Sequence, residues 1–274
     1  MNIENAVADH YGIPDLLGQI FTGLERVGAD LSKLTTEDLA PVDEFHIGGR
    51  KATAHAIAKL SPATDDHVLD IGCGIGGAAR YLAANVGCRV TGVDLTPEFI
   101  ATARALTEKT GLGDKVSYEV ASALDMPFAD AGFDGAITLH VVMNIHDRAG
   151  LYGEVARVLK PGATFCVYDV MKQGEDAVIY PVPWAETAET SHLTPPDEML
   201  ELLDGAGFEV FEVEDRTDFA RDFFKQTLAA VSDGSPPLGL NLLMGDTAPL
   251  KFKNMLENTE QGRIAVVQML ARRR

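Results

Sequence analysis

The sequence has few cysteines, no long apolar run and no signal-like start. Its 274 residues include 3 cysteines, Cys73, Cys88 and Cys166, without a C-x-x-C pair, so neither a disulfide framework nor a zinc site is predicted. No histidine spacing suggests a metal site either, and we expect no bound metal. No apolar segment reaches the roughly 20 residues that cross a membrane, and the first residues lack the basic and apolar regions of a secretory signal. We therefore expect a cytoplasmic protein without a membrane span.

Basic residues are scarce as well. The chain carries 23 Lys and Arg against 41 Asp and Glu, a formal net charge of −18. A protein that binds a phosphate backbone needs a basic surface, and the chain offers only the run Arg272–Arg274, so we expect no nucleic-acid partner. Solubility accounts for the acidity, and steering of a cationic cofactor or substrate is the alternative. The length and the hydrophobic content of 46% are typical of a globular protein with a large core and are compatible with a homo-oligomer.

The stretch from Val68 to Gly77 organises the rest of the chain. A buried apolar strand ends near Asp70, a glycine turn follows, and a helix is expected from Gly76 to Asn85. Gly72, Gly74 and Gly77 satisfy G-x-G-x-x-G, a pattern typical of sites for nucleotide-type cofactors. Such a turn needs residues without a Cβ, and the first N–H groups of the helix point back into it. The stretch therefore predicts a cofactor cradle.

Asp70 discriminates between two cofactors that such a turn can hold. A dinucleotide would place its charged pyrophosphate beside this carboxylate, which would repel it. S-adenosylmethionine (SAM) has no phosphate, and its sulfonium and α-ammonium are both attracted to a carboxylate. Asp94 ends the next strand, where it would take the ribose hydroxyls of either cofactor. The charge of Asp70 therefore favours SAM, with an NAD-type oxidoreductase as the alternative.

From His67 onward, apolar strand segments alternate with helical segments. This alternation predicts an α/β fold with a mostly parallel sheet and helices on both faces. The expected strands are 67–71, 89–94, 116–120, 133–139, 164–170, 208–214 and 264–270. The expected helices are 76–85, 97–110, 148–159, 196–206, 216–231 and 247–261. Because parallel strands end at one edge of a sheet, we expect the ligand cleft there.

Residues 1–60 are predicted to form an N-terminal helical cap over the active site. Apolar residues repeat at helical spacing from Ile13 to Val27, residues 41–50 read as irregular, and an alanine-rich helix runs from Ala52 to Leu60. This section cannot form a core of its own, so it must pack on the rest of the chain.

Residues 61–274 are predicted to form the cofactor-binding core. Two segments interrupt its alternation, 171–195 and 216–262, and the second contains a loop from Ser232 to Leu240. We expect both segments to act as lids that exclude water from the cleft.

Five segments resemble, in order and spacing, the motifs of class I SAM-dependent methyltransferases. They are Leu69–Gly76, Gly92–Asp94, Met126–Phe128, Phe133–Asp134 and Glu154–Gly162, and the resemblance extends over roughly residues 67–214. The flanks are similar to a narrower group, the small-molecule sarcosine/dimethylglycine N-methyltransferases and quinone C-methyltransferases. That likeness is carried by Phe45–Thr53, Met143–Ile145, Tyr168–Val170 and Tyr180–Trp184. The resemblance implies a Rossmann-like, seven-stranded sheet whose last strand, 264–270, is antiparallel to the others.

The resemblance also implies which residues bind the cofactor. They are Asp70, Gly72, Cys73, Gly74, Asp94, Leu95, Ser122, Ala123, His140 and Val141. Asp70 and the glycine turn would hold the methionine end of SAM, Asp94 the ribose, and His140 would lie near the sulfonium. Ser122 stands where the family usually has an acidic residue that accepts from the adenine amino group. A serine oxygen can still accept that bond, so we expect binding to be retained.

The candidate catalytic residues are histidines near the predicted cleft, namely His46, His140 and His146. Methyl transfer is an in-line displacement at carbon, so the enzyme mainly aligns acceptor, methyl and sulfur. A neutral amine needs no base during attack, whereas a phenol, an acidic carbon or a thiol must lose a proton. His146 has a structural alternative, because it precedes Asp147, the expected N-cap of the helix that starts at Arg148.

Aromatic side chains complete the predicted site. An aromatic face stabilises a sulfonium or ammonium by about 0.5–2 kcal/mol, and we expect Tyr11 to contact the cofactor. Tyr180 and Trp184, with Met143, would line the acceptor pocket, although Trp184 could instead simply pack against the sheet. The sequence thus predicts a SAM-dependent methyltransferase of small molecules that releases S-adenosylhomocysteine (SAH), with nitrogen slightly favoured as acceptor. A SAM-binding protein without catalytic activity is a second alternative.

Overall fold

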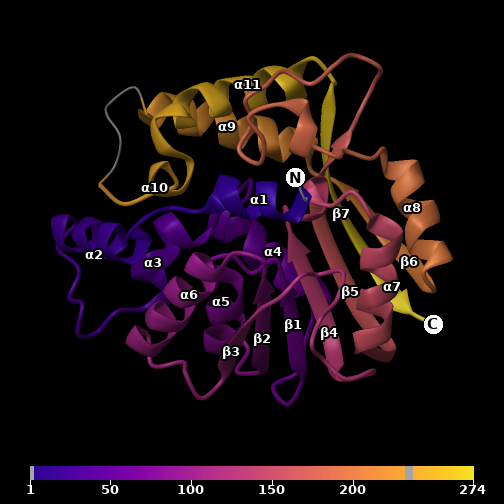
Figure 1. Ribbon diagram of the computed structural model, residues 1–274, viewed down its shortest axis with the longest axis horizontal. Helices are drawn as coiled ribbons and strands as arrows, with labels where there is room; N and C mark the ends of the chain where they lie inside the picture. Colours follow the sequence, from indigo (N-terminus) through magenta and orange to yellow (C-terminus); the bar gives the residue numbers. More distant parts are fainter. Residues whose placement is uncertain (1–2, 232–236) are drawn as a thin grey trace.

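The computed structural model, which describes residues 3–231 and 237–274, is built on one seven-stranded sheet (Figure 1). The strands are β1 (His67–Ile71), β2 (Arg89–Asp94), β3 (Val116–Val120), β4 (Phe133–Leu139), β5 (Leu159–Lys172), β6 (Phe208–Asp215) and β7 (Ile264–Arg273), in the order β3-β2-β1-β4-β5-β7-β6. Strands β1 to β5 pair in parallel, and β7 is antiparallel to both β5 and β6. The predicted Rossmann-like sheet with an antiparallel last strand is confirmed.

Strand β5 starts earlier than the sequence predicts. Leu159 already pairs with Phe133, and regular pairing resumes at Thr164 with Gly135. The residues between them leave the ladder at Gly162, whose φ of 83° suits a residue without a Cβ. The preceding helix therefore ends at Val158, and the expected turn lies inside the strand as an irregularity.

Helices cover both faces of the sheet. One face carries α4 (Gly49–Leu60), α5 (Gly77–Asn85) and α6 (Pro97–Lys109), and the other carries α7 (Arg148–Val158) and α8 (Pro196–Gly205). Alternate strand residues feed the two cores: Val68 packs with the first layer and Leu69 with the second, as the two-residue period of a strand requires. Most of these helices end within one residue of the predicted bounds, while α4 begins three residues before Ala52.

The N-terminal segment contains more helix than predicted. Its helices are α1 (Ile3–Tyr11), α2 (Leu16–Arg26) and α3 (Thr36–Asp43). The prediction of an irregular stretch at 41–50 is wrong in part, because Pro41 lies inside α3. A capping box starts this helix: Thr35 Oγ1 accepts from Asp38 N at 3.3 Å and the Asp38 carboxylate accepts from Thr35 N at 2.9 Å. The missing N–H of Pro41 costs little there, because the helix ends two residues later.

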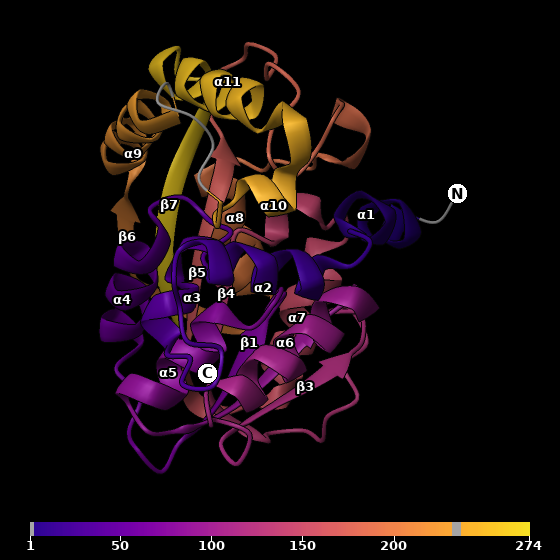
Figure 2. The same ribbon diagram turned by 90° about the vertical axis from the view of Figure 1, so that its left-hand side faces the viewer.

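The later helices lie beyond the carboxyl edge of the parallel strands (Figure 1). They are α9 (Thr217–Val231), α10 (Asn241–Met244) and α11 (Ala248–Glu260), and short 3-10 turns occur at η1 (Val142–Asn144), η2 (Ala188–Thr190) and η3 (Gly245–Thr247). The view in Figure 2 shows α11 above α1 and α2, and α10 above α2 and level with α1. Part of the predicted loop from Ser232 to Leu240, residues 232–236, lies outside the described residues, whereas Leu238 is buried against α2. Within the described ranges, no helix has the length and hydropathy needed to cross a membrane.

A buried ion pair fastens the N-terminal segment to the cofactor helix. Arg80 on α5 lies 2.5 Å from the Asp43 carboxylate at the end of α3, and neither side chain is exposed. Arg80 also donates to Ile75 O at 2.8 Å, inside the glycine turn. Gly77 has to lack a side chain, because a Cβ there would overlap the backbone oxygen of Asp43. The predicted cap and the predicted cradle thus share one packed contact.

Candidate functional site

A cavity of about 430 Å³ lies at the carboxyl edge of the sheet, a size typical of small-molecule sites. Its wall contains every residue that the sequence assigned to the cofactor: Asp70, Gly72, Cys73, Gly74, Asp94, Leu95, Ser122, Ala123, His140, Val141 and Tyr11. It also contains the candidate catalytic residues His46, His140 and His146, and two of the candidate acceptor contacts, Met143 and Trp184. Tyr180 is not part of this wall; it is half-buried and packs against the neighbouring hydrophobic core.

The glycine turn leaves room for a ligand. Gly72 N and Cys73 N donate to Val93 O at 2.8 and 3.0 Å, which fixes the turn to the end of β2. A Cβ on Gly72 would overlap the Val141 side chain, whereas a Cβ on Gly74 would meet nothing within 4 Å. Gly72 therefore lacks a side chain for packing, and Gly74, with a φ of 54°, faces open space in the cavity.

Asp70 lines this space with a carboxylate that the protein compensates only in part, through the Ala79 backbone N–H and the Arg80 charge. Its side chain is 2% exposed, and Oδ2 has no hydrogen-bond partner among the described residues. Burial, with a further contribution from the nearby Asp94 charge, raises the pKa of Asp70 to about 7. A cation in the cavity would satisfy this oxygen and favour the ionised form. The donor set therefore fits the ammonium and sulfonium of SAM and opposes a pyrophosphate.

Asp94 is oriented by backbone groups on both sides. Its Oδ2 accepts from Gly74 N and its Oδ1 from Thr96 N, each at 2.9 Å. Burial raises the pKa of Asp94, while these amide bonds oppose the shift. Each oxygen keeps a second lone pair, which suits a pair of ribose hydroxyls. Pro97 occupies the first turn of α6 as expected, but Thr96 at the N-cap position makes no side-chain capping bond.

The N-terminal helix supplies a cavity residue that the sequence did not reveal. Ser122 Oγ donates to the Glu4 carboxylate, and Glu4 also lines the cavity. Ser122 Oγ in turn accepts from Leu124 N at 3.1 Å. Further along α1, Tyr11 Oη donates to Asn144 Oδ1 at 3.0 Å. The one sequence signal for Glu4 was indirect, namely the absence of an acidic residue at position 122.

Two histidines of the cavity wall, the buried His46 and the half-buried His140, lie close to each other. His140 follows β4 with a φ of 56°, its N donates to Tyr168 O at 2.8 Å, and its ring centroid lies 6.0 Å from that of His46. Burial, reinforced by His46, lowers the pKa of His140 well below its ordinary value. Both ring nitrogens of His140 and Nδ1 of His46 have no partner among the described residues. The wall thus contains neutral imidazole nitrogen that is available to a ligand.

The third candidate histidine lies at the rim. His146 is exposed, and its ring packs edge-on against His192 with centroids 5.0 Å apart. The expected capping role of its neighbour is confirmed, since the Asp147 side chain accepts from Gly150 N at 2.9 Å at the start of α7. This geometry favours the structural alternative for the His146–Asp147 pair.

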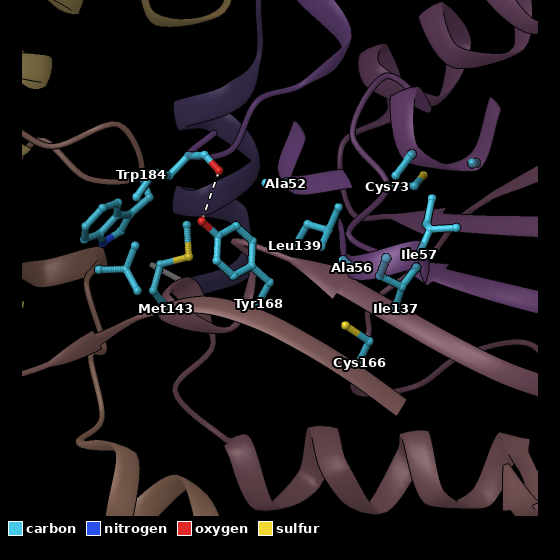
Figure 3. Close-up of a cluster of buried hydrophobic side chains, with 14 of the residues drawn as sticks. Ala52, Ala56, Ile57, Cys73, Ile137, Leu139, Met143, Cys166, Tyr168 and Trp184 are labelled. Atoms are coloured by element: carbon cyan, nitrogen blue, oxygen red, sulfur yellow. Dashed lines mark hydrogen bonds between the residues drawn. The ribbon is translucent and has the colours of Figure 1, made fainter. Parts of the chain in front are cut away.

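The remaining wall of the cavity is largely apolar and aromatic. Its members come from the connection between α3 and α4, from η1, from the 171–195 segment and from α9 to α11: Phe45, Ile47, Met143, Trp184, Phe223, Phe224, Leu240, Leu243, Met244, Phe252 and Met255. In Figure 3, Met143 lies between Trp184 and Tyr168. The Trp184 indole donates to Ser191 Oγ at 3.0 Å, and the Trp184 carbonyl accepts from Asn144 Nδ2 at 3.0 Å, so this aromatic wall is held at both ends. Among the described residues, no three His, Cys, Asp or Glu side chains are placed so that they could hold a metal ion together.

The chain is similar to known proteins in sequence and in fold. A methyltransferase-domain family model matches residues 69–167. O-methyltransferase resE of Aspergillus sclerotiorum is 31% identical over 225 residues, which are 80% of this chain and 81% of that protein. Sterol 24-C-methyltransferase of Eremothecium gossypii is 35% identical over 173 residues, 60% of this chain and 46% of that protein. The structure of geranyl diphosphate C-methyltransferase from Streptomyces coelicolor A3(2) has the same fold, with a TM-score of 0.73 at 18% identity over 100% of this chain and 99% of the other.

These matches decide between the alternatives that the sequence left open. The matched family model describes a methyltransferase domain, and the relative that matches over 81% of its length is a methyltransferase. These matches exclude the two alternatives, an NAD-type oxidoreductase and a SAM-binding protein without catalytic activity. The Asp70 carboxylate, whose Oδ2 has no partner among the described residues, supports the same conclusion because it suits the positive charge of SAM. The chain belongs to the class I SAM-dependent methyltransferases, and SAM is its methyl donor.

Proposed function

We propose that this enzyme methylates a hydroxyl oxygen of an apolar small molecule that binds between the glycine turn and helices α9 to α11. One observation carries the proposal: the cavity wall contains two imidazoles, His46 and His140, with buried ring nitrogens that have no partner among the described residues. A hydroxyl acceptor must lose its proton, and a neutral imidazole is the group that takes it near neutral pH.

The site gives less support to an amine acceptor, which the sequence slightly favoured. An amine is mostly protonated at neutral pH, and burying that charge in the cavity would need an unpaired carboxylate beside it, because the aromatic wall would stabilise the charge only in part. The two carboxylates on the cap side of the cavity are already engaged, Asp43 by Arg80 at 2.5 Å and Glu4 by the Ser122 hydroxyl. The name of the 31% identical relative, an O-methyltransferase, agrees with oxygen. The narrower likeness to sarcosine/dimethylglycine N-methyltransferases and quinone C-methyltransferases makes nitrogen and carbon the competing outcomes.

The residues of the cavity would divide the work as follows. Asp70 with Gly72, Cys73 and Gly74 would hold the methionine end of SAM, and Asp94 with Leu95, Ser122 and Ala123 would hold the adenosine. Val141, His140 and Tyr11 would surround the sulfonium, while Met143 and Trp184 would contact the acceptor. SAM supplies an electrophilic methyl group on sulfur, so the protein has to align the acceptor and remove its proton.

The cap and lids would keep this reaction dry. We propose that residues 1–60 close over the cavity from one side and that segments 171–195 and 216–262 of the 61–274 core close it from the other. Glu4, Phe45, Trp184 and Phe252 bring all three segments to the cavity wall. Excluding water strengthens the electrostatic contacts inside and protects the sulfonium from side reactions.

Matched aromatic probes test the acceptor atom. The enzyme is incubated with SAM carrying a labelled methyl group and either 1-naphthol or 1-naphthylamine, with excess SAH as the inhibited control. We expect 1-methoxynaphthalene from 1-naphthol, identified by mass spectrometry. Methylation of the naphthol ring would show that carbon, not oxygen, is the acceptor atom. Methylation of the naphthylamine alone would show that the acceptor atom is nitrogen. An enzyme that leaves 1-naphthol and a panel of bulkier apolar phenols unmethylated would contradict the proposal.

A further inference from the structure

An acidic residue, Glu44, and a threonine, Thr53, lie within hydrogen-bond distance of the His46 ring. Glu44 directly follows α3, His46 lies two residues further on, and Thr53 belongs to the second turn of α4. His46 Nε2 lies 2.8 Å from Thr53 Oγ1 and 3.1 Å from Glu44 Oε2, and Thr53 Oγ1 donates to Glu44 Oε2 at 2.5 Å. The three residues are 9%, 0% and 3% exposed for His46, Thr53 and Glu44. Water therefore does not compete for these bonds.

The directions of these bonds fix the tautomer of His46. Burial acts to raise the pKa of Glu44, but the hydrogen bond from His46, the charge of Arg50 and the hydrogen bond from Thr53 oppose it, and the pKa lies below its usual value. Glu44 is thus a carboxylate that can only accept, and the single Thr53 proton is already donated to it. His46 Nε2 faces two acceptors, so it must carry the ring hydrogen. Nδ1 of the neutral ring then holds the lone pair.

This lone pair is not consumed by the protein. His46 Nδ1 has no partner among the described residues, and His46 lines the cavity. The nearby Tyr168 hydroxyl donates elsewhere, to Ile47 O at 3.1 Å (Figure 3). His140, 6.0 Å away between ring centroids, also has both nitrogens unpartnered, but no acidic residue bonds to it. Of the two imidazoles, only His46 has a carboxylate that would stabilise its protonated form.

We propose that Nδ1 of His46 is the general base of methyl transfer, held in the productive tautomer by Glu44 and Thr53; this rests on the hydroxyl acceptor proposed above. The acceptor O–H bond breaks and its proton goes to Nδ1, while an oxygen electron pair forms the bond to the methyl carbon. The carbon–sulfur bond breaks, and its electron pair stays on sulfur, which becomes the neutral thioether of SAH. The positive charge moves from the sulfonium to an imidazolium whose Nε2–H faces Glu44. His46 is a catalytic residue in this scheme, and Glu44 and Thr53 are positioning residues.

The charged groups around His46 come from several elements and must be held constant in any test. They are Glu44 and Arg50 with Glu37 on the cap, the Asp43–Arg80 pair between α3 and α5, Asp70 on β1, and His140 and Tyr168 on β4 and β5. Apart from Glu44→Gln, none of the variants below changes a charge on these groups. The matched control is His55→Asn on α4, the helix that also carries Thr53. His55 pairs with Glu214 at 2.7 Å, at a half-exposed position outside the cavity.

Kinetics with 1-naphthol separate catalysis from folding. We expect His46→Ala to lower kcat about 10²- to 10⁴-fold, the range for loss of a general base, while the SAH Kd stays within about twofold. Wild-type kcat should fall as the pH is lowered, because a protonated His46 cannot accept the proton, and this limb should disappear in His46→Ala. Added imidazole should restore part of the lost rate. His55→Asn should leave kcat, its pH profile and the SAH Kd unchanged.

The positioning residues have their own matched pair. Thr53→Val removes the hydroxyl that bridges His46 and Glu44, and Thr53→Ser keeps it, so we expect about a tenfold loss of kcat in the first and near-full activity in the second. Glu44→Gln should lower kcat more than KM and shift the acid limb of the pH profile. A purely structural network predicts the reverse, namely loss of stability and SAH binding with no rescue by imidazole.

The tautomer can be read without any acceptor. In protein labelled with ¹⁵N-histidine, with His46→Gln used to assign the signals, we expect Nδ1 of His46 to resonate as an unprotonated acceptor and Nε2 as a protonated donor. A protonated Nδ1 would overturn the inference, as would a wild-type rate in His46→Ala. If instead 1-naphthol and the other phenols are not methylated while the NMR tautomer is as expected, the proposed hydroxyl acceptor has failed and the positioning of His46 has not.

Discussion

The cofactor half and the acceptor half of the cavity are built in different ways. The cofactor half consists largely of residues that directly follow strands β1, β2, β3 and β4, and the parallel sheet brings those positions together. The acceptor half is assembled from the α3–α4 connection, the 171–195 segment and α9 to α11, and the first of these precedes the other two by more than a hundred residues. The first half is dictated by a local pattern, and the second by packing. The acceptor half can therefore change without disturbing the cradle for SAM.

The largest expected effect comes from the contact that joins the two halves. Arg80→Met leaves Asp43 buried without its partner and removes the bond to Ile75 O inside the turn. We expect the free energy of unfolding to fall by about 3–5 kcal/mol, the usual cost of breaking a fully buried ion pair. Urea unfolding followed by circular dichroism measures it.

A double variant and a surface pair control this experiment. Asp43→Asn with Arg80→Met should cost less than the sum of the two single changes, because neither charge is then left unpaired. Arg221→Met breaks a pair with Asp218, whose side chain is 90% exposed, and should cost about 1 kcal/mol or less. A loss below about 1 kcal/mol in Arg80→Met would mean that the cap and the cradle are not coupled through this pair.

Asp70 gives the next largest effect, on the cofactor half alone. Asp70→Asn keeps the shape but removes the charge that faces the cavity, so we expect SAM affinity to fall about 10- to 100-fold, equivalent to about 1.5–3 kcal/mol for a hydrogen bond to a charged group. Isothermal titration measures the Kd. Glu44→Gln on the acceptor side should leave it within about twofold.

The raised pKa of Asp70 also predicts an unusual pH dependence of stability. With a pKa of about 7 in the folded protein and about 3.9 when unfolded, the folded state binds the proton more tightly. This contribution is fully present below the unfolded pKa and is lost as the pH rises through about 7. Without cofactor, Asp70→Asn should therefore be the more stable form at pH 8 and lose this advantage towards pH 4. Saturating SAM should reverse the order at pH 8, and equal stabilities across this range would contradict the assignment.

The residues that the sequence assigns to the cofactor lie together on one cavity wall for a physical reason. Asp70, Gly72 and Asp94 lie at the ends of apolar strands whose period and ending are visible in the chain, and parallel pairing then leaves them no other place. Glu44 and Glu4 could not be found in this way, because Glu44 meets His46 and Glu4 meets Ser122 only through the packing of helices whose own sequences do not state their partners. Tyr180 shows that the sequence can also place a residue in the site that packing keeps out of it. It is close in sequence to Trp184, but the connection turns between them and only Trp184 reaches the cavity.

Trp184 sharpens the comparison from the acceptor side. Trp184→Phe keeps an aromatic ring but loses area and the bond to Ser191 Oγ. We expect the KM for 1-naphthol to rise about tenfold, since about 1–1.5 kcal/mol of aromatic contact is lost, with the Kd for SAM unchanged. Tyr180→Phe is the matched control and should change neither. Unchanged acceptor kinetics in Trp184→Phe would assign this residue to packing alone.

The smallest expected effect tests the contact by which the start of the N-terminal helix reaches the cofactor half. Glu4 accepts from Ser122 Oγ, at the edge where we expect the adenine amino group. Glu4→Gln should weaken SAH binding about threefold, because a charged acceptor becomes neutral and contributes about 0.5–1 kcal/mol less. S-inosylhomocysteine, which has an oxygen in place of that amino group, should lose nothing in the same variant. Glu25→Gln, at an exposed position of α2, is the control. Equal losses for both ligands would mean that Glu4 only tethers α1, so that the cofactor half is complete without the cap.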